Sequence, residues 1–163
     1  MTGKDLQFEI GSCKRDDLEE IYKIEKNSFP TAWPRSSLER LFFQNSGFFL
    51  VVSKDQEIWG YAIATINRDI SFRGLSFEKK GHLLKLAVKE DMQNRGMGTA
   101  LLHNLDNLEK RLQKDDVGSF KLEVRVQNKK ARKFYKNAGF EEKKFIEDYY
   151  PDGGDAILMV KEF

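Results

Sequence analysis

Apolar residues recur along this chain at two different spacings, and each spacing predicts a type of element. Spacings of three and four residues indicate helices with one apolar side. We expect one helix to begin at Asp16 and three more to cover 38–42, 98–112 and 128–136. Period-two alternation and short apolar runs indicate strands, which we expect at 7–10, 48–53, 58–66, 82–88, 120–126, 145–146 and 156–160. A polar, glycine-containing loop is expected over 68–81. This order predicts an α/β fold with one mixed, mostly antiparallel sheet of about seven strands and helices on both faces.

The length and composition fit one soluble domain. The 163 residues suffice for a single continuous core, so we expect one domain over 1–163. Apolar residues make up 40% and charged residues 33%, an ordinary balance for a globular protein. The longest apolar run, 47–52, is far short of a membrane span, and the first residues lack the apolar stretch of a secretory signal. We therefore expect a cytoplasmic protein with no membrane partner.

Cysteine and charge narrow the chemistry further. The single cysteine, Cys13, excludes an internal disulfide and a multi-cysteine metal site, and we expect no metal. The 28 basic and 26 acidic residues give a net charge of +2, which does not by itself indicate nucleic acid. Basic residues cluster at 129–133 and 143–144, where they form either a solvated surface or a local site for a phosphate-bearing ligand.

A glycine-rich turn carries the first chemical signal. The expected strand ending at Leu86-Ala87-Val88 is followed by Gln93-Asn94-Arg95-Gly96-Met97-Gly98-Thr99 and then by a helix. Glycines at a helix N-terminus let backbone N–H groups approach a pyrophosphate. A P-loop would need Gly-Lys-Ser/Thr here, and a dinucleotide fingerprint would need glycine in place of Leu101. The pattern Gln/Arg-x-x-Gly-x-Gly/Ala is fully met, although a glycine-bearing turn without a ligand is the alternative.

A second motif, further along the chain, supports a ligand. It comprises Leu122 to Asn128, Ala131, Phe134-Tyr135 and Ala138-Gly139-Phe140. With both motifs the chain resembles the GNAT superfamily of acetyl-CoA-dependent N-acetyltransferases, and it is most similar to RimI-type ribosomal-protein and archaeal N-terminal acetyltransferases. The resemblance covers about residues 10–163 and implies the three-layer GNAT fold. The segment 148–156, with its tyrosine pair, resembles the corresponding loop of N-terminal acetyltransferases in particular.

The resemblance implies a set of binding residues. Acetyl-CoA would be the co-substrate, with its pantetheine arm paired to a strand and its pyrophosphate held by the glycine turn. The residues implied in cofactor binding are Leu86, Ala87, Val88, Gln93, Asn94, Arg95, Gly96, Met97, Gly98, Thr99, Asn128 and Tyr135. The acceptor would be a protein or peptide N-terminus, in a groove lined by Phe29, Pro30, Tyr149 and Tyr150.

In this family the amine attacks the thioester directly, which calls for a base and an acid. An α-amino group has a pKa of about 8 and must lose a proton before it attacks. A carboxylate whose pKa is raised by burial to about 7 would therefore serve as the base. Glu123 is the candidate, although Lys121, Glu123 and Arg125 also fit one solvated strand face. Tyr135 is the candidate acid for the CoA thiolate, and a core aromatic residue is its alternative. His82 is either a second proton-relay group or a hydrogen-bonded histidine at a strand end.

Expectations for three further residues follow from the sequence, and for one of them, Lys85, two interpretations are open. Lys85 stands where many relatives have a small hydroxyl residue. If its side chain enters the acceptor groove it favours acidic substrates, and if it points toward the helices it pairs with a carboxylate. We expect His103 to face solvent and Cys13 to fill a small buried apolar position.

Other functions remain open at the level of sequence. A GNAT enzyme for a small amine, such as a polyamine, is the nearest alternative, and the tyrosine pair argues against it. A non-catalytic CoA-binding module would bind acetyl-CoA without turnover. Nucleic-acid binding through the basic helix is the weakest alternative and is not expected. The sequence leaves open the preferred N-terminal residues, the oligomeric state, and whether an auxiliary subunit or the ribosome is a partner.

Overall fold

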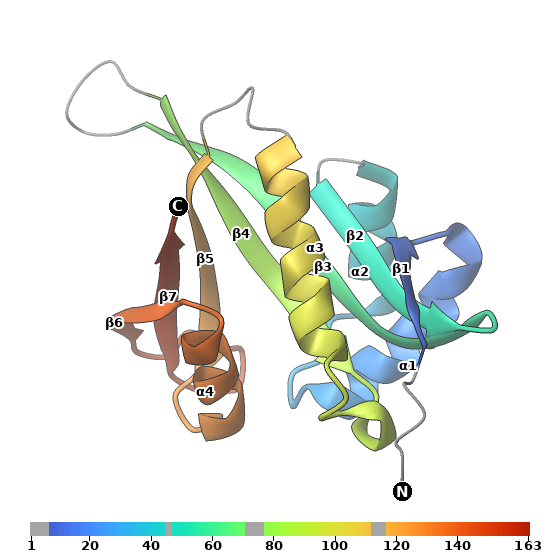
Figure 1. Ribbon diagram of the computed structural model, residues 1–163. Helices are drawn as coiled ribbons and strands as arrows, with labels where there is room; N and C mark the ends of the chain where they lie inside the picture. The colour runs from blue at the N-terminus through green and yellow to red at the C-terminus, as the bar shows by residue number, and fades with distance from the viewer. Residues whose placement is uncertain (1–6, 45–46, 71–76, 112–116) are drawn as a thin grey trace, which may run out of the picture. The chain divides into compact units, whose positions relative to one another are not determined.

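The computed structural model describes residues 7–44, 47–70, 77–111 and 117–163. Their strands form one seven-stranded sheet in the order β1-β2-β3-β4-β5-β7-β6, shown in Figure 1. The strands are β1 Glu9–Ser12, β2 Gly47–Lys54, β3 Glu57–Ile70, β4 Phe77–Val88, β5 Val117–Arg125, β6 Glu141–Ile146 and β7 Ala156–Glu162. The helices are α1 Leu18–Ser28, α2 Arg35–Gln44, α3 Met97–Arg111 and α4 Lys129–Asn137, with short 3-10 turns η1 Arg15–Asp17 and η2 Glu90–Met92. The predicted mixed α/β fold and its element order are confirmed.

The chain divides into two compact units. Unit 1 comprises residues 1–64 and 85–108, and unit 2 comprises residues 65–84 and 109–163. In the helices of the described ranges, no segment has both the length and the apolar character needed to cross a bilayer.

In unit 1, helices cover both faces of the strands. Strands β1 and β2 pair in antiparallel fashion from Glu9↔Ser53 to Ser12↔Leu50. Figure 1 shows α3 on one face of β2 and β3, with α1 and α2 on the other. The apolar side of each helix lies in the core, as its spacing predicts. The fully buried side chains here include Ile21, Leu38, Val52, Tyr61, Met97, Leu101 and Leu105.

In unit 2, β5 lies between a parallel and an antiparallel neighbour. It pairs with β4 in parallel, ending at His82↔Lys121, and with β7 in antiparallel fashion from Ser119↔Glu162 to Arg125↔Ala156. Strand β6 completes the antiparallel side by pairing with β7. The core is formed by Phe120, Leu122, Tyr135, Phe140 and Met159.

One sequence expectation about this region is wrong. The loop expected over 68–81 is shorter, because β3 continues to Ile70 and β4 already begins at Phe77. Residues 71–76 of that expected loop lie outside the described residues. Polar residues can extend paired strands because the backbone makes the hydrogen bonds, so sheet context overrides the weak strand propensity of this segment.

Candidate active site

The glycine turn of unit 1 has the backbone form of an anion site. Asn94 and Gly96 have left-handed backbone angles, with φ of 61° and 84°. The side-chain amide of Gln93 fixes the start of the turn by donating to the carbonyl of Val88 at 3.0 Å. The first bond of the α3 ladder runs from the N–H of Ala100 to the carbonyl of Gly96 at 3.0 Å. The N–H groups before it have no acceptor within the helix, and the helix dipole adds positive potential there.

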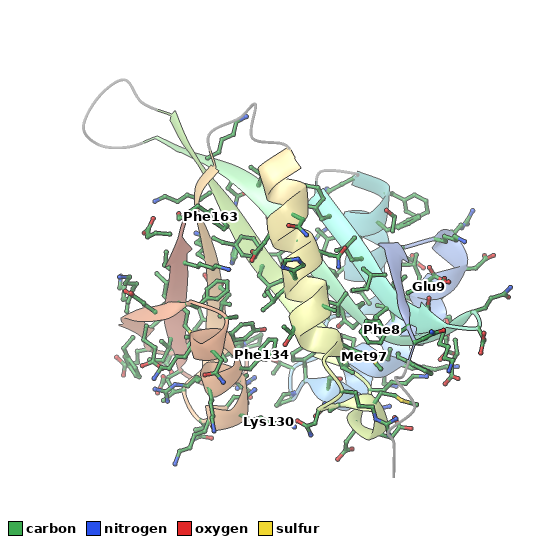
Figure 2. The ribbon with its side chains drawn as sticks, in the orientation of Figure 1. Phe8, Glu9, Met97, Lys130, Phe134 and Phe163 are labelled. Atoms are coloured by element: carbon green, nitrogen blue, oxygen red, sulfur yellow. The ribbon has the colours of Figure 1, made fainter. Side chains whose placement is uncertain are left out.

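Met97 takes part in this turn through its backbone only. Its side chain is buried in the core of unit 1 and marks the N-terminal end of α3 in Figure 2. Gly98 is half-buried and Thr99 is exposed. The predicted turn between β4 and α3 is therefore present, and its function as a diphosphate site stays a prediction.

The last residues of β4 are packed closely against β3. Ala87 and Val88 are buried, and Leu86 is half-buried. The N–H of Lys89 donates to the carbonyl of Trp59 at 2.8 Å. A Cβ atom on Gly60 would lie 2.6 Å from the Ala87 carbonyl oxygen, so only glycine permits this approach. The backbone that the family resemblance assigns to the pantetheine arm is thus held firmly within unit 1.

In unit 2, a histidine and a glutamate form a close pair. His82 Nε2 lies 2.6 Å from Glu123 Oε2, and the two side chains are only 16% and 13% exposed. Their strands place them together, because His82 is paired in register with Lys121, two residues before Glu123. The hydroxyl of Tyr149 also donates to the Glu123 carboxylate. Glu123 therefore does not belong to a solvated strand face. His82 makes a hydrogen bond, as predicted by its interpretation as a hydrogen-bonded histidine.

The pKa of Glu123 departs from its usual value in the direction opposite to our expectation. Burial raises this pKa, as we assumed from the sequence. The hydrogen bonds from His82 and Tyr149, with the charges of His82 and Lys121, outweigh burial and lower it. The expectation of a carboxylate raised toward neutrality is therefore wrong, and Glu123 is ionised at neutral pH.

Three tyrosines of unit 2 keep their protons. Tyr135, on α4, is buried, and its ring packs edge-on against those of Phe134 and Phe140, with centroids 5.1 and 5.8 Å away. Burial raises the pKa of Tyr135 and raises that of Tyr150 to about 12. Burial and then the charge of Glu123 raise the pKa of Tyr149. Tyr135 is thus a core aromatic residue, as one of its two interpretations predicts. Because burial keeps its hydroxyl protonated, the same residue remains available as a proton donor.

An arginine organises the tyrosine-pair loop. The guanidinium of Arg125 lies 4.1 Å from the ring centroid of Tyr150, and its Nη1 lies 3.1 Å from Asp152 Oδ1. Gly154 makes room for it, since a Cβ there would lie 2.3 Å from Arg125 Nη1. The loop is also closed by a 3.0 Å bond from the N–H of Tyr150 to the carbonyl of Gly154. Tyr149 and Tyr150 pack edge-on at 4.9 Å between centroids.

Lys85 adopts the second of its two predicted arrangements. Its ammonium lies 2.9 Å from Glu25 Oε1 in unit 1, and Glu25 is fully buried. The same ammonium lies 3.9 Å from the ring centroid of Phe29 and 4.7 Å from that of Trp33. Lys85 therefore pairs with a carboxylate and at the same time contacts a residue of the expected acceptor groove. Pro30, next to Phe29, is exposed.

The sequence analysis missed Glu25 and Arg125 as organising residues. A signal for Glu25 was present, because it follows Ile24 and lies four residues after Ile21, on the apolar side of α1. An acidic residue on such a side requires a partner when it is buried. Arg125 carried no comparable signal, since its partner Asp152 is far away in sequence.

The remaining candidates have ordinary structural positions. The side chain of Asn128 caps α4 by accepting from the N–H of Ala131 at 3.1 Å. In the basic cluster, Arg132 bonds Glu142 at 2.7 Å, whereas Lys130 extends from the exposed side of α4 in Figure 2. His103 is exposed, as expected. Cys13 is buried, and burial with the charge of Asp17 raises its thiol pKa to about 12, which confirms its structural role.

Comparison with known proteins gives the class to which this fold and these groups belong. The chain belongs to the acetyltransferase (GNAT) family, whose family model matches residues 18–140. An uncharacterized N-acetyltransferase of Methanocaldococcus jannaschii is 34% identical, over 90% of this chain and 86% of that protein. The N-alpha-acetyltransferase of Sulfurisphaera tokodaii is 33% identical, over 96% and 93% respectively. The crystal structure of the ribosomal-protein-S18-alanine N-acetyltransferase from Escherichia coli matches with a TM-score of 0.77 and 29% identity, covering 96% of this chain and 94% of that one. The resemblance drawn from the two motifs is thus confirmed.

Proposed function

We propose that this acetyltransferase transfers the acetyl group of acetyl-CoA to the α-amino group at the N-terminus of a protein, and that residues 1–163 act as one catalytic domain. The observation that carries the proposal is the His82–Glu123–Tyr149 cluster, in which an ionised carboxylate, an imidazole and a phenol share hydrogen bonds. The two named relatives that act on N-terminal amines or on a ribosomal-protein alanine support this acceptor.

Unit 1 supplies the binding groups for the cofactor in this proposal. The N–H groups at the start of α3, with the turn over 94–99, have the chemistry that a diphosphate requires. The donors belong to the backbone, so Gly96 matters through its conformation and not through a side chain. The backbone of 86–88 would pair with the pantetheine arm, and Asn128 is a further proposed contact of that arm.

Unit 2 supplies the proton-transfer groups. Acetyl-CoA provides a thioester, and as the amine nitrogen bonds to the acetyl carbon and the C–S bond breaks, the amine loses a proton and the departing thiolate gains one. Because Glu123 is ionised, it can hold the imidazole of His82 in orientation and share the proton that the amine gives up. We therefore assign the base to the His82–Glu123 pair, directly or through a water. Tyr135, protonated by virtue of its burial, is the proposed donor to the thiolate.

Two segments carry the proposed acceptor groups. Phe29 and Pro30 belong to the segment between α1 and α2, and Tyr149 and Tyr150 belong to the loop that Arg125 organises. Aromatic rings and phenol hydroxyls suit a peptide backbone better than a small polyamine, whose charges would call for carboxylates. The reaction would take place in the cytoplasm, on an acceptor presented alone, by the ribosome or by an auxiliary subunit. Neither a membrane nor nucleic acid is part of the proposal.

Acetyl-CoA turnover over a panel of peptides with varied first and second residues tests this function. We expect CoA release to depend on a free N-terminal amine and to disappear with peptides blocked by N-formylation. Spermidine measured in parallel separates the small-amine alternative. Binding of acetyl-CoA without turnover of any amine would contradict the proposal and favour a non-catalytic CoA-binding module.

A further inference from the structure

Lys85 and Glu25 form an enclosed ion pair in unit 1. The Lys85 side chain is 11% exposed and that of Glu25 is 0% exposed. One carboxylate oxygen of Glu25 receives the Lys85 ammonium at 2.9 Å and the backbone N–H of Trp33 at 2.8 Å. The other oxygen accepts from the hydroxyl of Tyr61. A buried carboxylate needs such compensation for its lost hydration.

The same pair fixes the segment between α1 and α2. Residues 29–34 have no helix or strand of their own. The N–H of Phe29 bonds the Glu25 carbonyl at 3.2 Å, and the N–H of Trp33 bonds the Glu25 side chain. The rings of Phe29 and Trp33 both lie against the Lys85 ammonium, at 3.9 and 4.7 Å from their centroids. A cation held at this distance from two rings is attracted by both.

We propose that the Lys85–Glu25 pair sets the acceptor selectivity of the enzyme. This inference rests on the proposed function, which assigns Phe29 to the acceptor groove. Because Glu25 balances the charge of Lys85, this lysine presents no uncompensated cation beside the aromatic rings of Phe29 and Trp33. An acidic acceptor side chain would lose hydration there without gaining a counter-ion, so N-termini whose first two side chains are not acidic are the preferred substrates.

The substitution Glu25→Gln tests this selectivity, because it leaves Lys85 charged and removes its balancing carboxylate. The readout is the ratio of kcat/KM for peptides that carry Glu to kcat/KM for matched peptides that carry Gln, at the first and at the second position. In the wild type we expect a ratio below one. In Glu25→Gln we expect the ratio to rise about tenfold at one of the two positions, since an uncompensated cation at an effective dielectric of about 20 attracts a nearby carboxylate.

Two further variants keep the test decisive. Glu25→Gln/Lys85→Met removes both charges and should return the ratio to its wild-type value. Lys85→Gln leaves Glu25 charged and should lower the ratio below its wild-type value. This variant therefore tests the selectivity proposal even if Glu25→Gln does not fold. Glu142→Gln is the matched control, because that carboxylate also pairs with basic residues, Arg132 and Lys136, but in unit 2. Its ratio should equal that of the wild type.

The outcomes separate the two proposals. A wild type that acetylates peptides, combined with a ratio that stays constant in Glu25→Gln and Lys85→Gln, overturns the selectivity proposal alone. A wild type that turns over no peptide α-amine overturns the proposed function and this inference with it. A ratio that moves in opposite directions in the two single variants and returns in the double variant supports the role of the pair.

Discussion

In unit 1 Glu25 meets Lys85 of β4, in unit 2 Glu123 meets His82 of the same strand, and the two glutamates have different surroundings. Glu25 in unit 1 is fully buried, and it contacts an ammonium, a backbone N–H and a phenol in fixed positions. Glu123 in unit 2 is partly accessible, and its partners are an imidazole and a tyrosine that is itself 43% exposed. An ion pair whose carboxylate is fully buried holds a segment in place, whereas a carboxylate that water can reach, beside titratable groups, can take part in proton exchange.

The largest effect that would test this contrast is expected from Glu123→Gln. The amide keeps the size of the side chain but cannot share a proton with His82, so we expect kcat to fall about 100-fold or more, with acetyl-CoA affinity unchanged. Steady-state kinetics over the preferred peptide, with acetyl-CoA binding measured by calorimetry, checks both parts. Glu141→Gln, which removes an exposed carboxylate paired with Lys143, is the control. Wild-type kcat in Glu123→Gln would show that the cluster has no catalytic role.

A smaller effect is expected from Gly96→Ala, which tests whether unit 1 acts through its backbone. Gly96 has a φ of +84°, and nothing lies within 4 Å of a Cβ added there. Alanine would be strained by the left-handed backbone alone, at a cost of about 1–2 kcal/mol. We expect KM for acetyl-CoA to rise about tenfold while kcat stays near its wild-type value.

The control for Gly96→Ala lies in the same unit. A Cβ on Gly11 also meets nothing within 4 Å, and Gly11 has no left-handed φ. Gly11→Ala should therefore leave both constants unchanged. If Gly96→Ala changes kcat and leaves the KM for acetyl-CoA unaltered, the turn does not act as a diphosphate site.

The loop with the tyrosine pair provides a third test, on the acceptor. Gly154→Ala places a Cβ too close to Arg125 Nη1, so the guanidinium must shift relative to Asp152 and Tyr150. Without that anchor the loop should order less well around a peptide, and we expect KM for the peptide to rise about fivefold, close to 1 kcal/mol. KM for acetyl-CoA should not change. An equal change in both KM values would mean that the loop has a general structural role instead.

The sequence predicts the backbone-built parts of the molecule better than its side-chain clusters. The turn at Gly96 and the helix expected over 128–136 depend on residues close together in sequence, and both are present. The ends of β3 and β4 were missed, because strand length there depends on pairing and not on local composition.

The side-chain clusters depend on distant residues. Glu123 and His82 were identified through a family resemblance. Their contact, and its consequence for the pKa of Glu123, arise only because the fold brings together two residues that are 41 positions apart in sequence. Glu25 meets Tyr61 over 36 residues. The burial of Glu123 was expected from the sequence. The hydrogen-bond partners that reverse the effect of burial on its pKa could not be predicted from the spacing of residues.

The smallest predicted effect concerns stability, and it distinguishes the two possible directions of the Glu123 pKa. A carboxylate whose pKa is lowered by folding stabilises the protein fully above its usual pKa of about 4.3, and this contribution disappears as pH falls through the lowered value. We therefore expect wild type to melt a few degrees above Glu123→Gln at pH 6, and the difference to shrink by pH 3. In a His82→Gln background the pH-dependent part of this difference in melting temperature should be smaller, because one of the hydrogen bonds that lower the pKa of Glu123 is gone. A difference that instead grows on acidification would mean that burial prevails, and that the pKa of Glu123 is raised as the sequence first suggested for the base.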